Sequence, residues 1–330
     1  MDVEERLRQL EDEIKNLSKP VDPNPPKEKW GLVLAGGGGK GAFQSGAFKA
    51  LVERGIFSQF AGISGCSVGA LNMVLFAHGD VAMAQDVWKN ISNDQFLKID
   101  TELIDLKEGI FSRTGLEKLM DDYINFDLIS DYKYPLFAAT SVFKANSDPE
   151  PLYIPLKGES RENIKTILLA SSALPYAYEN VIFNSMVLKD GGITDNTPIK
   201  PLYDLGIRHF YVIDLSASAP SPSERYKDCV FVHIKPFKNI GGLIDGTLDF
   251  TAKGAKLRME LGYLDTIRTL DFLDKDLSKK EVLQVMNIRG ENEYNQVLFD
   301  QEFEKNSDYV NNSLGKIKDI YDRFLSFRKM

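Results

Sequence analysis

Cysteine and histidine are scarce in this chain of 330 residues, which has two of the first and three of the second. Two cysteines, Cys66 and Cys229, are too few for a disulfide framework and favour a reducing compartment. No run approaches the roughly 20 apolar residues of a membrane-spanning helix. The first residues also lack the basic and apolar regions of a secretory signal. We therefore expect a cytoplasmic protein with no transmembrane segment, and peripheral contact at a membrane stays open.

An excess of basic residues is missing as well. The chain has 40 lysines and arginines against 48 aspartates and glutamates, which gives a formal net charge of -8 at pH 7. Such a chain is not attracted as a whole to nucleic acid, so we predict no nucleic-acid partner. Its length and its hydrophobic share of 43% are typical of one large globular α/β domain, alone or with a helical addition.

The sequence pattern divides the chain into three parts. Residues 1–28 combine an amphipathic helix, with apolar residues at a 4-3-4-3 spacing, and a proline-rich linker. We expect this helix to pack on the body of the protein or to join two copies of the chain. Residues 29–235 carry the strands and motifs, and residues 236–330 are predicted to form a mainly helical extension packed on them. Whether the mostly helical residues 81–133 form a lid or a wall is left open.

Strands and helices alternate in the central part. A buried strand at 30–35 precedes a glycine-rich loop and a helix, and a second strand at 60–64 precedes another helix. Apolar runs at 135–142, 210–215 and 230–234 add further strands. This order predicts an α/β fold of three layers with a central, mostly parallel sheet.

The segment Gly65-Cys66-Ser67-Val68-Gly69 carries the strongest chemical signal. It is a G-x-S-x-G sequence between an apolar strand and a helical pattern, which is the context of a nucleophile elbow. The flanking glycines remove Cβ clashes at the tight turn, and the serine N–H lies at a helix N-terminus that favours negative charge. Ser67 is therefore the candidate nucleophile, although the same five residues also arise by chance in glycine-rich turns.

The loop Gly36-Gly37-Gly38-Gly39-Lys40-Gly41 has two interpretations. It satisfies the dinucleotide pattern G-x-G-x-x-G, but the second strand ends in the elbow and not in the acidic residue that would hold a ribose. A phosphate-binding Walker loop fails too, because Lys40 is followed by glycine and not by serine or threonine. Exposed N–H groups at a helix start also stabilise an oxyanion, and the neighbouring serine elbow makes us favour that use.

A serine hydroxyl needs a base, and the residues alone leave its identity open. Asp190 ends a predicted hairpin and is followed directly by Gly191-Gly192, a turn that lets its carboxylate project. The same pattern is also typical of an Asx turn, in which the carboxylate bonds to nearby backbone. His209 and His233 follow Asp190, as the Ser, Asp, His order of α/β-hydrolases requires, but both begin or lie within predicted strands. His78 stands at the end of a predicted helix.

Taken in order, the glycine loop, the elbow with Ala70-Leu71-Asn72 behind it, and Asp190-Gly191-Gly192 resemble the patatin-like phospholipase family. The segments 170–175 and Asn196-Thr197-Pro198 agree with this resemblance, which covers roughly residues 30–265, while Lys40 stands where the family often has arginine. It implies a patatin-like sandwich and a Ser-Asp dyad in which Ser67 is the nucleophile and Asp190 the base. It also implies oxyanion donors from Gly37 and Gly38, and neither metal nor organic cofactor. The supporting motif positions are Gly36, Gly39, Lys40, Gly41, Gly65, Gly69, Gly191 and Gly192.

The same resemblance implies an activity. It predicts hydrolysis of fatty-acyl esters of phospholipids or lysophospholipids through a covalent acyl-enzyme, with the lipid met at a membrane or micelle surface. Acyl transfer or thioester hydrolysis at the same site stays open as an alternative. A regulatory binding protein without turnover is a further alternative. The intact Ser67 and Asp190 argue against it.

Overall fold

The computed structural model describes residues 29–93, 112–144, 147–175 and 177–327, with side chains up to residue 305. It divides into two compact units, one ending at Asp276 and one beginning at Leu277, and each is described by itself. The helix predicted within residues 1–28 and part of the excursion at 81–133 lie outside the described residues. None of the described helices combines the length and apolar composition needed to cross a membrane.

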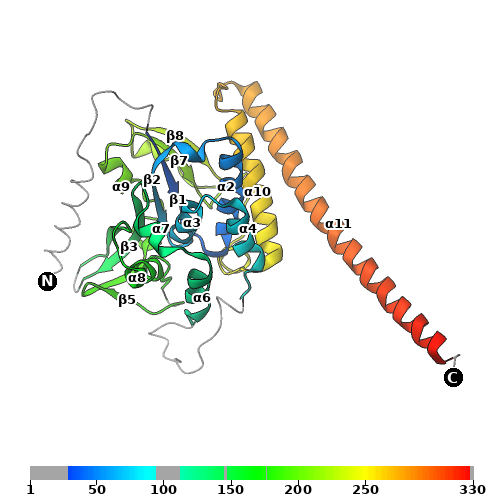
Figure 1. Ribbon diagram of the computed structural model, residues 1–330. Coiled ribbons are helices and arrows are strands. Elements are labelled where there is room, and N and C mark those ends of the chain that lie inside the picture. Colours follow the sequence, from blue (N-terminus) through cyan, green and yellow to red (C-terminus); the bar gives the residue numbers. More distant parts are fainter. Residues whose placement is uncertain (1–28, 94–111, 145–146, 176, 328–330) are drawn as a thin grey trace. The chain divides into compact units, whose positions relative to one another are not determined.

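One mixed sheet forms the centre of the first unit (Figure 1). Its strand order is β5-β6-β3-β2-β1-β7-β8, and β4 also pairs with β3. The pairs β3–β2, β2–β1, β1–β7 and β7–β8 are parallel, whereas β4, β5 and β6 are joined by antiparallel pairing, so the predicted mostly parallel sheet is confirmed. The strands are β1 (Trp30–Leu34), β2 (Phe60–Cys66), β3 (Leu136–Phe143), β4 (Glu150–Pro155), β5 (Val181–Phe183), β6 (Met186–Asp190), β7 (His209–Ile213) and β8 (Val230–Ile234).

Helices cover both faces of this sheet, which gives the three predicted layers (Figure 1). The short α9 (Lys200–Asp204) lies on one face, where Leu202 packs with Val33 and Phe210 in a buried cluster. The elbow helix α3, together with α2 and α10, lies on the other face. Strands buried on both faces need apolar residues in succession, which explains the continuous apolar runs in the sequence. The helices of this unit are α2 (Ala42–Glu53), α3 (Val68–Ala77), α4 (Val81–Asn90), α6 (Thr114–Tyr123), α7 (Phe126–Ser130), α8 (Arg161–Ser171), α9 and α10 (Ala252–Asp271).

Helix α10 crosses α2 at very short range. A Cβ added at Gly46 would lie 1.8 Å from the Met259 carbonyl oxygen, and one at Gly262 would lie 2.0 Å from the Phe43 carbonyl oxygen. Only glycine permits this approach of two helix backbones. The sequence places a boundary at residue 235, whereas the compact unit that contains the sheet continues to Asp276.

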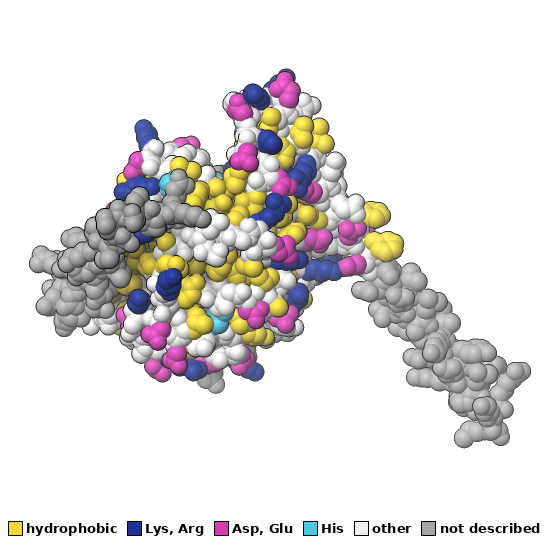
Figure 2. Space-filling model, turned by 45° about the horizontal axis from the view of Figure 1, so that its top comes forward, with side chains coloured by type: hydrophobic (Ala, Val, Ile, Leu, Met, Phe, Trp, Pro, Cys, Tyr) yellow, Lys and Arg dark blue, Asp and Glu magenta, His cyan; other side chains and the backbone are white. Residues whose placement is uncertain are grey.

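The second unit consists mainly of α11 (Lys280–Phe327). Along its described part, Arg289 pairs with Glu293 one turn away, and Phe299 stacks on Phe303 at 6.5 Å between ring centres. Both phenylalanines are exposed, and Figure 2 shows apolar side chains along this helix. On the face of the molecule drawn there, positive and negative side chains are interspersed.

Candidate active site

The register of the sheet brings Ser67 and Asp190 together. Antiparallel β4 occupies one edge of β3 along Phe137–Val142. Because a strand has only two edges, β2 and β6 must share the other edge, and they approach each other end to end. The last residue of β2, Cys66, pairs with Ala139, and the last residue of β6, Asp190, pairs with the next residue, Thr140. Ser67 and Asp190, which are 123 positions apart in the sequence, therefore meet at the same point.

Ser67 occupies a strained turn between β2 and α3. Its φ of 54° and ψ of -126° are unusual for a residue with a side chain, as an elbow requires. A Cβ at Gly65 would lie 2.4 Å from the Gly69 carbonyl oxygen, so the glycines of the motif let the turn close on itself. The Ser67 N–H donates to Ser171 Oγ at 2.9 Å, and that hydroxyl donates to the Ala139 carbonyl at 2.7 Å. Ser171 thus fixes the backbone of the candidate nucleophile.

The Asp190 carboxylate is buried and accepts three hydrogen bonds, of which the longest, at 4.0 Å, comes from Cys66 Sγ to Oδ1. Its Oδ2 accepts the Ser67 hydroxyl at 2.7 Å, and its Oδ1 accepts the Gly192 N–H at 2.8 Å. The Asx turn and the contact with serine, which the sequence offers as alternatives, are therefore both present. Burial raises the pKa of Asp190 to about 6, although the hydrogen bonds from Ser67 and Gly192 lower it.

The glycine loop lies against the elbow. A Cβ at Gly36 would lie 3.0 Å from the Ser67 Cβ, and Gly38 has a φ of +57°. Neither the Gly37 N–H nor the Gly38 N–H donates a hydrogen bond to another described residue. These two donors stand at the start of the 3-10 turn η1 (Gly38–Gly41), where an anion is favoured. Burial, followed by the nearby Arg258, lowers the pKa of Lys40 in this loop.

Asn196 fixes the beginning of the glycine loop. Its side-chain Nδ2 donates to the Gly36 carbonyl at 3.2 Å, while its own carbonyl accepts the Gly36 N–H at 3.3 Å. The sequence names Asn196 only as part of a segment that agrees with the family resemblance. No residue pattern predicts this contact across 160 positions.

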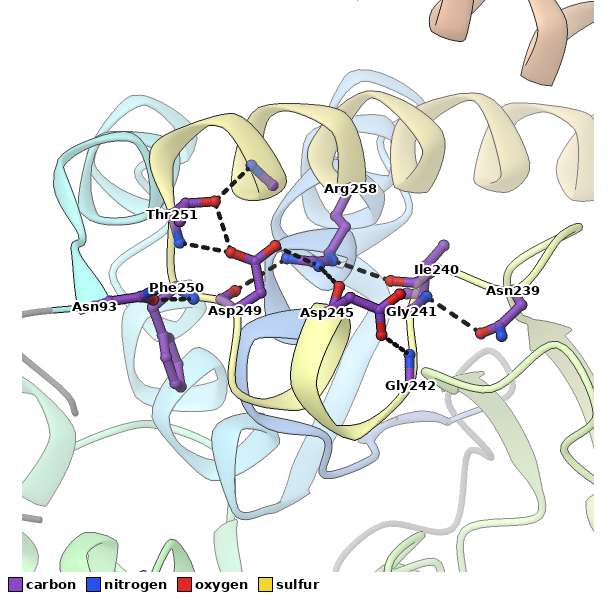
Figure 3. A network of polar contacts seen from close by, with 11 residues as sticks. Asn93, Asn239, Ile240, Gly241, Gly242, Asp245, Asp249, Phe250, Thr251 and Arg258 are labelled. Carbon is purple, nitrogen blue, oxygen red and sulfur yellow. Dashed lines mark hydrogen bonds and ion pairs between the residues drawn. The ribbon is translucent and has the colours of Figure 1, made fainter.

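A second support was not predicted, and it comes from residues 240–250 with Arg258 (Figure 3). The Arg258 side chain is 3% exposed and donates to the carbonyl oxygens of Ile240, Asp245 and Asp249 at 3.2, 2.7 and 3.0 Å. It also pairs with the Asp249 carboxylate at 2.8 Å. The segment held in this way touches the glycine loop, since a Cβ at Gly38 would lie 2.2 Å from the Thr247 carbonyl oxygen. Arg258 is therefore a positioning residue for that loop.

All three histidines lie in the described part of the chain, and each is placed away from Ser67. The His78 Nε2 accepts the Asn125 N–H at 2.9 Å, and His78 stands at the far end of α3, about 15 Å from the elbow at 1.5 Å per residue. His209 pairs with Trp30 at the starts of β7 and β1, whereas Ser67 follows the end of β2. His233 lies in β8, three strand spacings or about 14 Å from β2.

Ser67 and Asp190 line an apolar pocket of about 330 Å³. Leu71 and Leu75 of α3 and Trp88 of α4 form part of its wall. Trp88 is fixed by a hydrogen bond from its Nε1 to Asn72 Oδ1 at 3.0 Å. Both α4 and α6 contribute to the wall, so described parts of the excursion at 81–133 form part of the pocket. Within the described residues no group of three histidine, cysteine or acidic side chains could hold a metal ion.

The comparisons with known proteins identify the family of this chain. The model of the patatin-like phospholipase family matches residues 32–203, and the chain belongs to that family. It is 28% identical over 222 residues to lysophospholipase NTE1 of Cryptococcus neoformans, a match that covers 61% of this chain and 12% of the relative. It is 28% identical over 205 residues to neuropathy target esterase sws of Drosophila melanogaster, covering 60% of this chain and 14% of the relative.

These relatives are far longer, since the chain spans about an eighth of their length. Among solved structures, VipD from Legionella pneumophila is similar with a TM-score of 0.43 and 13% sequence identity. That match covers 74% of this chain and 67% of VipD.

We predict that Asp190→Asn stabilises the protein at neutral pH. In the folded state the pKa of Asp190 is about 6, whereas its ordinary pKa is 3.8. Ionising the buried group therefore costs stability as the pH rises from about 4 to 6. Asparagine removes this cost. The free energy of unfolding of the variant should therefore exceed that of wild type by an amount that grows over this interval and reaches up to ~3 kcal/mol at pH 8. Urea unfolding at pH 4, 6 and 8 measures the difference; a difference that does not change with pH contradicts the prediction.

Proposed function

We propose that this chain is a serine acyl hydrolase that cleaves fatty-acyl esters of phospholipids or lysophospholipids at Ser67. The observation that carries the proposal is the 2.7 Å hydrogen bond from Ser67 to the buried Asp190 in the wall of an apolar pocket. Membership of the patatin-like phospholipase family supports it, as does the name of a relative that is called a lysophospholipase.

In the first half-reaction Asp190 Oδ2 takes the proton of the Ser67 hydroxyl as Oγ attacks the acyl carbonyl carbon. The carbonyl electrons move to its oxygen, and the Gly37 and Gly38 N–H groups donate to this oxyanion. When the tetrahedral intermediate collapses, the ester C–O bond breaks and the leaving alcohol takes the proton from Asp190. The acyl group stays on Ser67 as an ester.

In the second half-reaction Asp190 takes a proton from water, and the resulting hydroxide attacks the acyl-enzyme. The second intermediate breaks the bond to Ser67 Oγ, which recovers the proton from Asp190, and the fatty acid leaves. A carboxylate is a weak base at its ordinary pKa of 3.8, and the value of about 6 brings Asp190 nearer to neutral pH. Burial thus makes the base stronger without a histidine.

We predict that a fluorophosphonate probe labels Ser67 and that Ser67→Ala abolishes labelling and ester hydrolysis. Asp190→Asn keeps the side-chain shape but removes the base, so labelling should slow by several orders of magnitude. His233→Gln is the comparison, since His233 lies about 14 Å from the elbow strand β2, and it should retain labelling. Peptide mass spectrometry locates the label. A label on another serine, such as Ser64, or a His233→Gln variant that is folded yet unlabelled, would refute the proposal.

Gly37→Ala tests the proposed oxyanion donors. The added Cβ would meet the flexible Leu215 side chain at 2.8 Å, so the fold can adjust while the donor shifts. Gly38→Ala is a poorer test because its Cβ would meet a backbone carbonyl. Losing one donor typically costs about 3 kcal/mol, or roughly a hundredfold in kcat.

Gly79→Ala is the matched control for this variant. Its φ is +72°, a left-handed conformation that strains an alanine, but nothing lies within 4 Å of its added Cβ, so Gly79→Ala should lose stability and keep its turnover. Steady-state hydrolysis of a soluble ester measures both variants. Equal kcat values for Gly37→Ala and wild type would remove Gly37 from the oxyanion hole.

A further inference from the structure

Leu243 and Ile244 are neighbouring apolar side chains that the fold leaves exposed. They are 63% and 80% exposed, and they begin η5 (Leu243–Thr247), one π-helical turn between β8 and α10. A single exposed aliphatic side chain needs no explanation, whereas contiguous exposed apolar surface is typical of interaction sites.

The following residues of the same segment belong to the candidate active site. Thr247, Leu248 and Phe250 line the apolar pocket. The Thr247 carbonyl also lies against the glycine loop, 2.2 Å from where a Gly38 Cβ would be. Leu243 and Ile244 are thus joined by one helical turn to residues that line the pocket and support the proposed oxyanion donors.

This turn is held firmly, and its acidic side chains have partners within the protein (Figure 3). The Asp245 carboxylate accepts the Gly242 N–H at 2.7 Å, and the Asp249 carboxylate accepts from Arg258 and from the Thr251 hydroxyl. Arg258 in turn fixes the backbone at Asp245 and Asp249. A firmly held turn whose carboxylates are already bonded can present its apolar pair to a surface without first rearranging.

We propose that Leu243 and Ile244 insert into the surface of a zwitterionic lipid bilayer and hold the pocket against it. The proposal rests on the proposed function, because a substrate with fatty-acyl chains is found in lipid aggregates. The formal net charge of -8 opposes electrostatic attraction to an anionic membrane, so the contact depends on apolar side chains.

Vesicle binding tests this proposal. All variants carry Ser67→Ala, so that no lipid is consumed, and phosphatidylcholine vesicles are the probe. L243S/I244S should bind these vesicles about tenfold less tightly or worse, since two apolar side chains lose their transfer into lipid. The matched control V230S/L273S removes two aliphatic side chains that are 51% and 46% exposed and do not line the pocket, and it should bind like its parent. Thermal melting checks that each variant is folded.

A second measurement reports insertion directly. Tryptophan replaces either Ile244 or Val230, and lipids with a quencher on the acyl chain are added. Fluorescence from the Ile244→Trp protein should be quenched beyond that of its parent, and fluorescence from the Val230→Trp protein should not. Equal quenching of the two, or no binding of the parent to phosphatidylcholine, overturns the proposal.

Other occupants of the surface give different results. Binding that requires anionic lipid and falls with salt overturns the proposal, because it would be electrostatic. Loss of a dimer in L243S/I244S, with vesicle binding unchanged, overturns it in favour of a contact between copies. Vesicle binding and quenching test this proposal, whereas fluorophosphonate labelling and hydrolysis of a soluble ester test the proposed function, so the two can fail separately.

Discussion

The shared edge of β3 is the constraint on which the candidate site depends. Antiparallel β4 takes one edge, so the ends of β2 and β6 must meet on the other, at Ala139 and Thr140. The meeting point is reinforced by Ser171, which bonds to both the Ala139 carbonyl and the Ser67 N–H. A one-residue slip of β6 would turn Asp190 to the opposite face of the sheet, because side chains alternate along a strand. The hydrogen bond between Ser67 and Asp190 is thus a consequence of strand register.

Three segments that are distant in sequence then fix the glycine loop beside this point. The elbow packs against Gly36, Asn196 bonds to both sides of the Gly36 peptide, and the Thr247 carbonyl closes over Gly38. Donors that are held in place before a substrate arrives need no reorganisation when negative charge develops. This preorganisation is the main source of the rate acceleration that an oxyanion hole provides. Arg258 contributes indirectly. It bonds to the backbone at Asp245 and Asp249, and the segment between them contacts the glycine loop.

The sequence predicts those parts of the fold that depend on local patterns. Continuous apolar runs locate the parallel strands, and the elbow, the glycine loop and the Asp-Gly-Gly turn appear as short motifs; the family and the α/β class are confirmed. The choice between Asp190 and a histidine depends on which strands are neighbours, which no local pattern contains. Asn196 and Arg258 act on backbone carbonyls, which every residue has, so their partners leave no signal in the sequence. The catalytic roles of Ser67, Asp190, Gly37 and Gly38 stay predictions.

We propose that a buried carboxylate, and no histidine, activates Ser67. The most direct test is the pH dependence of kcat/KM for a soluble ester, measured for wild type and for His209→Gln and His233→Gln. Because Asp190 must be ionised to accept the proton, kcat/KM should rise with pH and level off above an apparent pKa of about 6, with the same midpoint in all three proteins. A rising limb that shifts or disappears in a folded histidine variant would show that the histidine is the base, and would contradict the account.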